Sequence, residues 1–119
     1  MLPITEITVL EYEDEDGESP FSDWFDDLDP APAARVTMAL ARMEHGNFGD
    51  IKSVGDGVME RRITFGPGYR IYVGRDGATL VILLGGGTKQ RQDRDIEKAK
   101  WRWDDYQRRK QGLDPKSWH

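Results

Sequence analysis

The residues of this sequence best suited to chemistry are charged or aromatic and fall at alternate positions of two neighbouring segments. Glu60 and Arg62 alternate with apolar residues in one segment, and Arg70 and Tyr72 do so in the next. Alternate residues of a strand share a face, so we expect these four side chains on one exposed face of a sheet. Two lysines, one before the first segment and one after the next apolar run, complete the set: Lys52 and Lys89.

A set of this composition suits the binding of phosphate groups and nucleotide bases. Guanidinium groups bind phosphate through two parallel hydrogen bonds, and a tyrosine ring can stack on a base. Four cations on one face repel each other unless an anion neutralises them. The same residue types also occur at ordinary solvent-facing positions of a sheet that is covered on one side. Residue type alone leaves both interpretations open.

Other chemistry has little support in the sequence. There are no cysteines, which excludes disulfides and thiolate metal sites. The histidines, His45 and His119, have no metal-ligand spacing to carboxylates, and we expect no metal and no cofactor. Residues 85–87 are three glycines that resemble a phosphate-binding loop only in composition, and we interpret them as the end of a strand.

The elements that position these residues follow from the spacing of apolar side chains. Residues 4–12 favour a strand, and helices are predicted to begin at Ser19-Pro20 and at Asp29-Pro30, the second ending near Gly46. Beyond Gly46 the apolar period changes from 3.6 to 2. The further predicted elements are strands at 58–65, 69–74 and 79–84, a hairpin turn at 75–77, and a helix from Asp93 or Asp95.

The predicted order is β-α-α-β-β-β-α, an α+β fold with the helices packed on one face of a mostly antiparallel sheet. The predicted strand at 79–84 is apolar from Leu80 onward, which is typical of a central strand covered on both faces. The chain, 1–119, is one domain, with a loose tail at about 111–119. The core residues expected from the first two helices are Phe21, Trp24, Phe25, Leu28, Val36, Leu40 and Met43.

The charge of the chain is unevenly distributed along its length. The formal net charge is -5, but residues 1–50 hold 13 acids and 2 bases (net -11) and residues 51–119 hold 9 acids and 15 bases (net +6). We therefore expect one acidic and one basic face. The N-terminus lacks the pattern of a signal peptide, and the longest apolar run, Leu80–Leu84, is too short to cross a bilayer. We expect a cytoplasmic protein.

Several segments together resemble one family of bacterial toxins. They are HGNFGD (45–50), GDGVMERRI (55–63), GPGYRIY (66–72) and GGTK (86–89) with Gln92, Asp95 and Ile96. They are similar to the HigB-like "addiction module killer" branch of the RelE/ParE toxin superfamily, from Phe21 to about Trp103. The segment at 66–72 is the most specific part. The resemblance implies the RelE-like fold, with the element order given above.

The resemblance also implies an activity: ribosome-dependent cleavage of mRNA, in which a 2'-hydroxyl attacks the adjacent phosphodiester without a metal. By position, Arg62 and Arg70 match arginines that hold the scissile phosphate, and Lys89 matches a lysine after the last strand. Glu60 is one candidate for the general base, and Lys89 is the other. An exposed phosphate ligand adds little stability, so we expect Arg70→Ala to abolish cleavage and leave folding nearly intact. The RNA-binding residues are assigned as Lys52, Tyr72 and Arg91.

The implied partners are the ribosome with its mRNA and a cognate antitoxin with a helix-turn-helix domain, which forms a hetero-oligomer with the toxin. Arg61 departs from the aliphatic residue usual in the family, and we expect it at the sheet edge or against an acidic helix. Some members of the superfamily inhibit DNA gyrase and cleave nothing, and fold alone does not separate the two activities. An inactive RNA-binding relative is a third possibility, and the retained Glu60, Arg62, Arg70 and Lys89 favour the nuclease.

Overall fold

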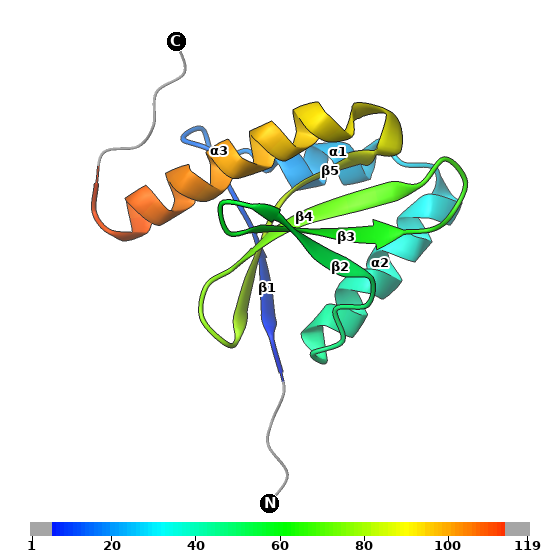
Figure 1. Cartoon of the computed structure of the whole chain (residues 1–119), viewed down its shortest axis with the longest axis horizontal. Helices are drawn as coiled ribbons and strands as arrows, with labels where there is room; N and C mark the ends of the chain where they lie inside the picture. The colour runs from blue at the N-terminus through cyan, green and yellow to red at the C-terminus, as the bar shows by residue number, and fades with distance from the viewer. Residues whose placement is uncertain (1–5, 114–119) are drawn as a thin grey trace, which may run out of the picture.

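A mixed sheet of five strands forms the middle layer of residues 6–113, the residues that the computed structural model describes (Figure 1). The sheet and three α-helices within these residues make the chain an α+β protein. The elements, in order, are β1 (Thr8–Glu11), α1 (Pro20–Asp26), α2 (Pro30–Glu44), β2 (Ile51–Gly55), β3 (Val58–Ile63), β4 (Tyr69–Arg75), β5 (Leu80–Thr88), the 3-10 turn η1 (Lys89–Arg91) and α3 (Gln92–Lys110).

The spatial order of the strands is β1-β5-β4-β3-β2. β1 runs parallel to β5, and every other neighbouring pair is antiparallel. The prediction of three consecutive antiparallel strands is confirmed by β3, β4 and β5. β2 was not predicted, because its sequence, IKSVG, has no clear alternation of apolar and polar residues. The first residues of the predicted N-terminal strand and the end of the predicted tail lie outside the described residues.

The predicted helix starts are confirmed. Ser19 is the N-cap of α1 and its hydroxyl accepts a hydrogen bond from the Ser22 amide at 3.1 Å, while proline occupies the first position of both α1 and α2. After α2, Gly46 has φ of 84°, a left-handed conformation that glycine adopts at low cost and that ends the helix.

One face of the sheet packs against α1 and α2. Phe21, Val36 and Met43 from these helices are buried against Ile71 and Val73 of β4. The other predicted core residues of the two helices, Trp24, Phe25, Leu28 and Leu40, are partly buried against the same cluster. The predicted packing of these helices is therefore confirmed.

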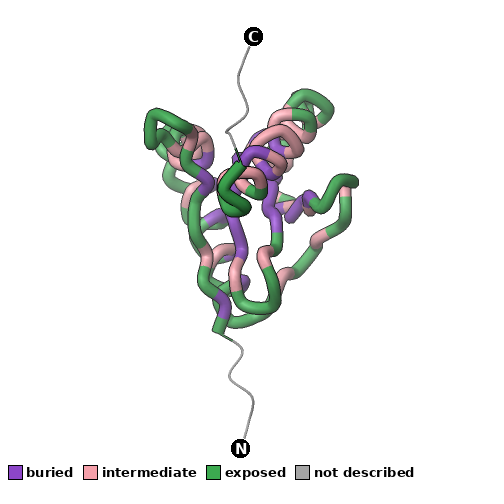
Figure 2. Tube along the Cα trace, turned by 90° about the vertical axis from the view of Figure 1, so that its left-hand side faces the viewer, coloured by how far each residue is buried: buried purple, intermediate pink, exposed green. Residues whose placement is uncertain are grey.

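The prediction that all helices cover one face is wrong, because α3 packs on the opposite face (Figure 1). Ala99 and Trp103 of α3 join a second core cluster with Val58, Tyr72, Ile82 and Leu84 of the sheet. The buried segments consequently run through the middle of the molecule (Figure 2). The physical reason is that β5 is apolar on both faces, and α3 has an apolar stripe of its own that must also be buried.

Residues 85–87 do not end β5, contrary to the prediction, but lie inside it. They are glycines because neighbouring side chains occupy the space beside them. A Cβ atom on Gly86 would lie 2.2 Å from the Trp24 ring, and one on Gly87 would lie 2.0 Å from Asp95 Oδ2. α1 and α3 thus approach β5 from opposite faces more closely than a larger residue would allow.

Two polar clusters attach the C-terminal part of α3 to the sheet. The Tyr12 hydroxyl donates to Asp105 Oδ2 at 2.7 Å, and Arg109 Nη2 lies 2.6 Å from the same oxygen. In the second cluster, Tyr106 and Lys110 both bond the Asp76 carboxylate in the β4–β5 turn. Asp105 is fully buried, so its two partners offset the desolvation of its charge.

Candidate functional site

The predicted site residues of β2, β3 and β4 form two rows across the sheet on the α3 face. In the first row Lys52 pairs with Glu60, and Glu60 pairs with Tyr72. In the second row Arg62 pairs with Arg70. The register therefore brings together the residues that the sequence placed on one face, although it does not leave all of them exposed.

Glu60 lies at the centre of the site and is fully buried. Its Oε2 accepts a hydrogen bond from Gln92 Nε2 at 2.8 Å, so the first residue of α3 contacts β3 directly. Its Oε1 lies 3.4 Å from Arg70 Nε and 4.0 Å from Lys52 Nζ. The carboxylate thus has an amide on one oxygen and two cations near the other.

Arg62 and Arg70 are directly opposite each other on neighbouring strands, an arrangement that is unfavourable for two like charges. Arg62 Nη2 lies 3.2 Å from Asp50 Oδ1, and both of these side chains are substantially exposed. The two arginines border an open groove of about 360 Å³ that also has Asp50 and Lys89 in its wall. Residues 63–69, at and around the β3–β4 connection, also line the groove.

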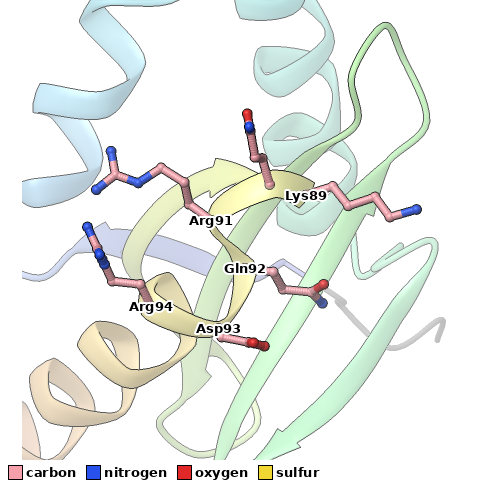
Figure 3. A pocket seen from close by; sticks show the side chains of 6 residues that line it. Lys89, Arg91, Gln92, Asp93 and Arg94 are labelled. Carbon is pink, nitrogen blue, oxygen red and sulfur yellow. The ribbon is translucent and has the colours of Figure 1, made fainter.

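Lys89 and Arg91 extend to opposite sides of η1 (Figure 3). Lys89 reaches across the ends of β3 and β4, whereas Arg91 points with Arg94 toward the side where α1 lies. A second hollow of about 430 Å³ is lined by residues 89–94, so Lys89 borders both hollows. Within the part of the chain that is described, Lys89 has no ion-pair partner. The groove that holds Arg62, Arg70 and Lys89 therefore includes neither Arg91 nor Lys52 among its lining residues.

The predicted exposure of Glu60, Arg70 and Tyr72 is wrong. Tyr72 and Glu60 have no exposed surface, and Arg70 is 8% exposed, because α3 covers this part of the face. Tyr72 consequently cannot stack on a base, and its pKa is raised mainly by burial, with further contributions from Glu60 and Asp95. The prediction that Arg70→Ala would leave folding nearly intact loses its basis, since Arg70 is the close counter-ion of a buried carboxylate.

Three residues of the site were not assigned from the sequence: Asp50, Gln92 and Asp95. Asp50 pairs with Arg62 across β2 and β3, which required knowledge of the missed strand β2. Asp95 lies against Gly87 in the first turn of α3, and burial raises the pKa of its carboxyl even though three arginines and Lys98 act to lower it. The available signal for Gln92 was its place three residues after Lys89, at the start of the last helix.

Arg61 is not at the sheet edge, because β2 lies outside β3 and pairs Ile51 with Arg61. Its side chain is buried and donates a hydrogen bond to the Arg62 carbonyl. Burial is the main cause that lowers the pKa of its guanidinium, with Asp50 acting in the opposite direction. The arginine therefore lies beneath the β2–β3 pair, on the side of the sheet away from the groove.

The geometry fits an anion in the groove. Two guanidinium groups and one ammonium group surround an open hollow beside the β3–β4 connection, and guanidinium groups favour phosphate oxygens. Among residues 6–113, no group of three or more His, Asp or Glu residues is arranged to hold a metal ion. No helix in that range is both long enough and apolar enough to span a membrane.

Comparison with known proteins gives one relative and no family model. No protein-family model matches the chain. An uncharacterized protein of Haemophilus influenzae is 48% identical to it over 81 residues, which make up 67% of this chain and 82% of that protein. Identity of this extent, over most of the relative's length, shows common descent. The chain therefore belongs to the same family as this Haemophilus influenzae protein.

Proposed function

We propose that this chain is a toxin of the RelE/ParE superfamily, HigB-like branch, and that it cleaves ribosome-bound mRNA in the groove beside β3 and β4. The observation that carries the proposal is the direct pairing of Arg62 with Arg70 at a groove that Lys89 also borders. Each arginine has one carboxylate partner, Asp50 for Arg62 and Glu60 for Arg70, and Lys89 adds a further positive charge that a phosphodiester in the groove would neutralise.

The proposed reaction needs no atoms beyond those of the RNA. The 2'-hydroxyl gives its proton to a base, the 2'-oxygen forms a bond to the adjacent phosphorus, and the bond from phosphorus to the 5'-oxygen breaks. The 5'-oxygen takes up a proton, and a 2',3'-cyclic phosphate remains. The guanidinium groups of Arg62 and Arg70 stabilise the negative charge that develops on the phosphoryl oxygens, an effect of about 10²–10³ in rate for each such donor. Lys89, with an exposed side chain at the groove, is the candidate for proton transfer, because Glu60 is fully buried.

The arrangement of elements supports the RelE-like assignment as far as the sequence defined it. Two helices follow the first strand, three antiparallel strands follow those, and a long helix comes last. The strand β2, between α2 and β3, is additional to the order that the sequence predicted. The proposed partners are the ribosome with mRNA and a helix-turn-helix antitoxin in the cytoplasm. The antitoxin would contact either the Arg62, Arg70 and Lys89 face or the two N-terminal helices, of which α1 is the acidic one.

The direct test is induction of the protein without any partner, followed by mapping of mRNA ends. We expect growth arrest and cuts within codons on ribosomes. Arg62→Ala and Lys89→Ala should each reduce cutting by about 10²-fold or more, since each removes charge from the groove. Lys98→Ala, which removes an α3 cation that does not border the groove, should leave cutting unchanged and serves as the matched control.

Two other outcomes would contradict the nuclease. Growth arrest with intact mRNA and inhibited DNA gyrase would place the chain with the gyrase-inhibiting toxins. Binding to ribosomes or RNA without cleavage, and without growth arrest, would identify an inactive relative.

A further inference from the structure

The buried Glu60 carboxylate is the feature of the site that the proposed reaction leaves without a role. We propose that Glu60, held by Gln92, is a positioning residue that orients Arg70 toward the groove, and that it takes no part in proton transfer. This inference rests on the proposed function for its consequence in catalysis. Its structural part, the orientation of Arg70, can be tested in the free protein.

The surroundings of Glu60 keep its carboxylate away from the groove. The side chain has no exposed surface and is absent from the wall of the groove. A general base must come within hydrogen-bond distance of the proton that it removes. Glu60 has Gln92 on one carboxylate oxygen and Arg70 nearest the other, at 3.4 Å. Neither oxygen is therefore placed to reach a 2'-hydroxyl in the groove.

Arg70 lies between Glu60 and the groove. Its Nε lies 3.4 Å from Glu60 Oε1, an ion-pair contact without hydrogen-bond geometry. The Nε–H side of a planar guanidinium includes one terminal nitrogen, and the other terminal nitrogen lies away from that side. Nη1 lies 3.9 Å from the point that a Cβ atom of Gly68 would occupy, beside the β3–β4 connection. Arg70 itself borders the groove. The inner edge of the guanidinium is thus used by the protein, and the outer edge is left for an anion.

Gln92 holds the Glu60 carboxylate. It is the first residue of α3, and its side-chain amide donates 2.8 Å to Glu60 Oε2. A neutral amide fixes the rotation of the carboxylate and leaves its charge for Arg70, whereas a lysine or arginine at this position would compete for it. The start of α3 therefore sets the position of Glu60, and Glu60 in turn sets the position of Arg70.

Stability alone does not require this pair. A buried ion pair is often no more stabilising than apolar residues of the same size, because desolvation offsets the attraction. Here the pair lies beside the groove. Glu60 attracts Arg70 and so holds it in position although the neighbouring Arg62 repels it. A positional role accounts for a buried charge at this point of the sheet.

The first experiment observes the Arg70 Nε–H group by NMR in the free, RNA-free protein. We expect a resolved resonance protected from solvent exchange, which Glu60→Gln should broaden or remove and Gln92→Ala should weaken. Gln90→Ala is the matched control, since Gln90 is exposed in the same turn and should leave the signal unchanged. An Arg70 signal unaffected by Glu60→Gln would overturn the proposal.

The second experiment measures cleavage of a defined mRNA on 70S ribosomes in a double-mutant cycle. Glu60→Gln should lower the single-turnover rate about 10-fold, and it should have no further effect once Arg70 is alanine, because it acts through Arg70. Glu60→Gln should also retain the shape of the pH–rate profile. A general base would instead give a loss of about 10²–10⁴, independent of Arg70, together with loss of the acidic limb of the profile.

The two experiments separate the failure of this inference from the failure of the proposed function. If the NMR result is as expected and the wild type cleaves no RNA, the positioning stands and the nuclease proposal falls. If the wild type cleaves and Glu60→Gln lowers the rate by the same factor with and without Arg70, the nuclease stands and the positioning role is wrong.

Discussion

The two faces of the sheet differ in what their side chains accomplish. The face under α1 and α2 is an apolar cluster in which Phe21, Val36 and Met43 pack against the sheet. The face under α3 is apolar at one end, around Trp103, and charged at the other, around Glu60 and Arg70. α3 crosses both ends, so one helix covers a core and also borders the site (Figure 1).

This difference shows how a small domain can hold a charged site on a sheet that it also needs for its core. The α1 and α2 face supplies continuous apolar burial, which is the main source of stability. The α3 face gives up part of its apolar area to buried charge, and polar clusters at the C-terminal end of α3 attach the helix there. Substitutions on the two faces should therefore have different consequences.

The largest expected effect comes from Arg70→Ala. Removing Arg70 leaves the buried Glu60 without its closest counter-ion, and we expect a loss of about 3–5 kcal/mol in the free energy of unfolding, measured with urea. Adding Glu60→Gln should restore most of this loss. Arg62→Ala removes an exposed pair and should cost less than about 1 kcal/mol. Equal losses for the two arginines would contradict the contrast drawn between them.

On the apolar side, Gly86→Ala should destabilise the protein by about 1–3 kcal/mol, because the new methyl group would overlap the Trp24 ring. Trp24→Ala in the same chain provides the space, so the two changes should be strongly non-additive in thermal or urea denaturation. Additive losses would show that the close approach of α1 to β5 is not what requires glycine.

The polar attachment of α3 should be weaker. Tyr12→Phe removes one hydrogen bond from the buried Asp105 and leaves the contact with Arg109. We expect a loss of about 1–2 kcal/mol at neutral pH. Tyr106→Phe, at a less buried site, should cost less. Hydrogen exchange of the last turns of α3 should increase in both variants, and no change in either would contradict this role.

The smallest expected effect is a dependence on alkaline pH. Burial is the largest cause that raises the pKa of Tyr12, Tyr72 and Tyr106, the last to about 12, against an ordinary value of 10.0. The folded state therefore keeps protons that the unfolded state loses, so stability should fall as pH rises above 10. Tyr72→Phe should reduce this slope by up to about 1.4 kcal/mol per pH unit. An unchanged slope would contradict the burial of Tyr72.

Much of the fold could be predicted from the sequence because its elements carry strong local signals. The caps at Ser19 and Gly46 and the alternation in β3 and β4 located those elements. The side of the sheet chosen by α3 could not be read from any one element. It follows from matching its apolar stripe to the second face of β5, and the apolar run at 80–84 already required cover on both faces.

The shared face of the candidate site residues was predicted, and their strand register and burial were not. Alternation placed Glu60 and Arg62 on one face, and the hairpin brought Arg70 opposite Arg62. The burial of Glu60 depends on its contact with Gln92, which lies 32 positions later in the sequence. That contact depends on the direction in which the chain continues from β5 into α3. The role of Glu60 consequently changed from candidate base to candidate support once its surroundings were known.

The parallel pairing of β1 with β5 also has a consequence for synthesis of the chain. Thr8 pairs with Leu80, so the first strand has no partner until most of the chain has been translated. Residues 1–50 emerge first and carry a net charge of -11. This charge opposes collapse and helps to keep the segment soluble until β5 has been synthesised. Folding is therefore delayed until β5 leaves the exit tunnel. Lys89 of the groove and Gln92, which contacts Glu60, are both added after β5, so the groove and the support of Glu60 form late in synthesis.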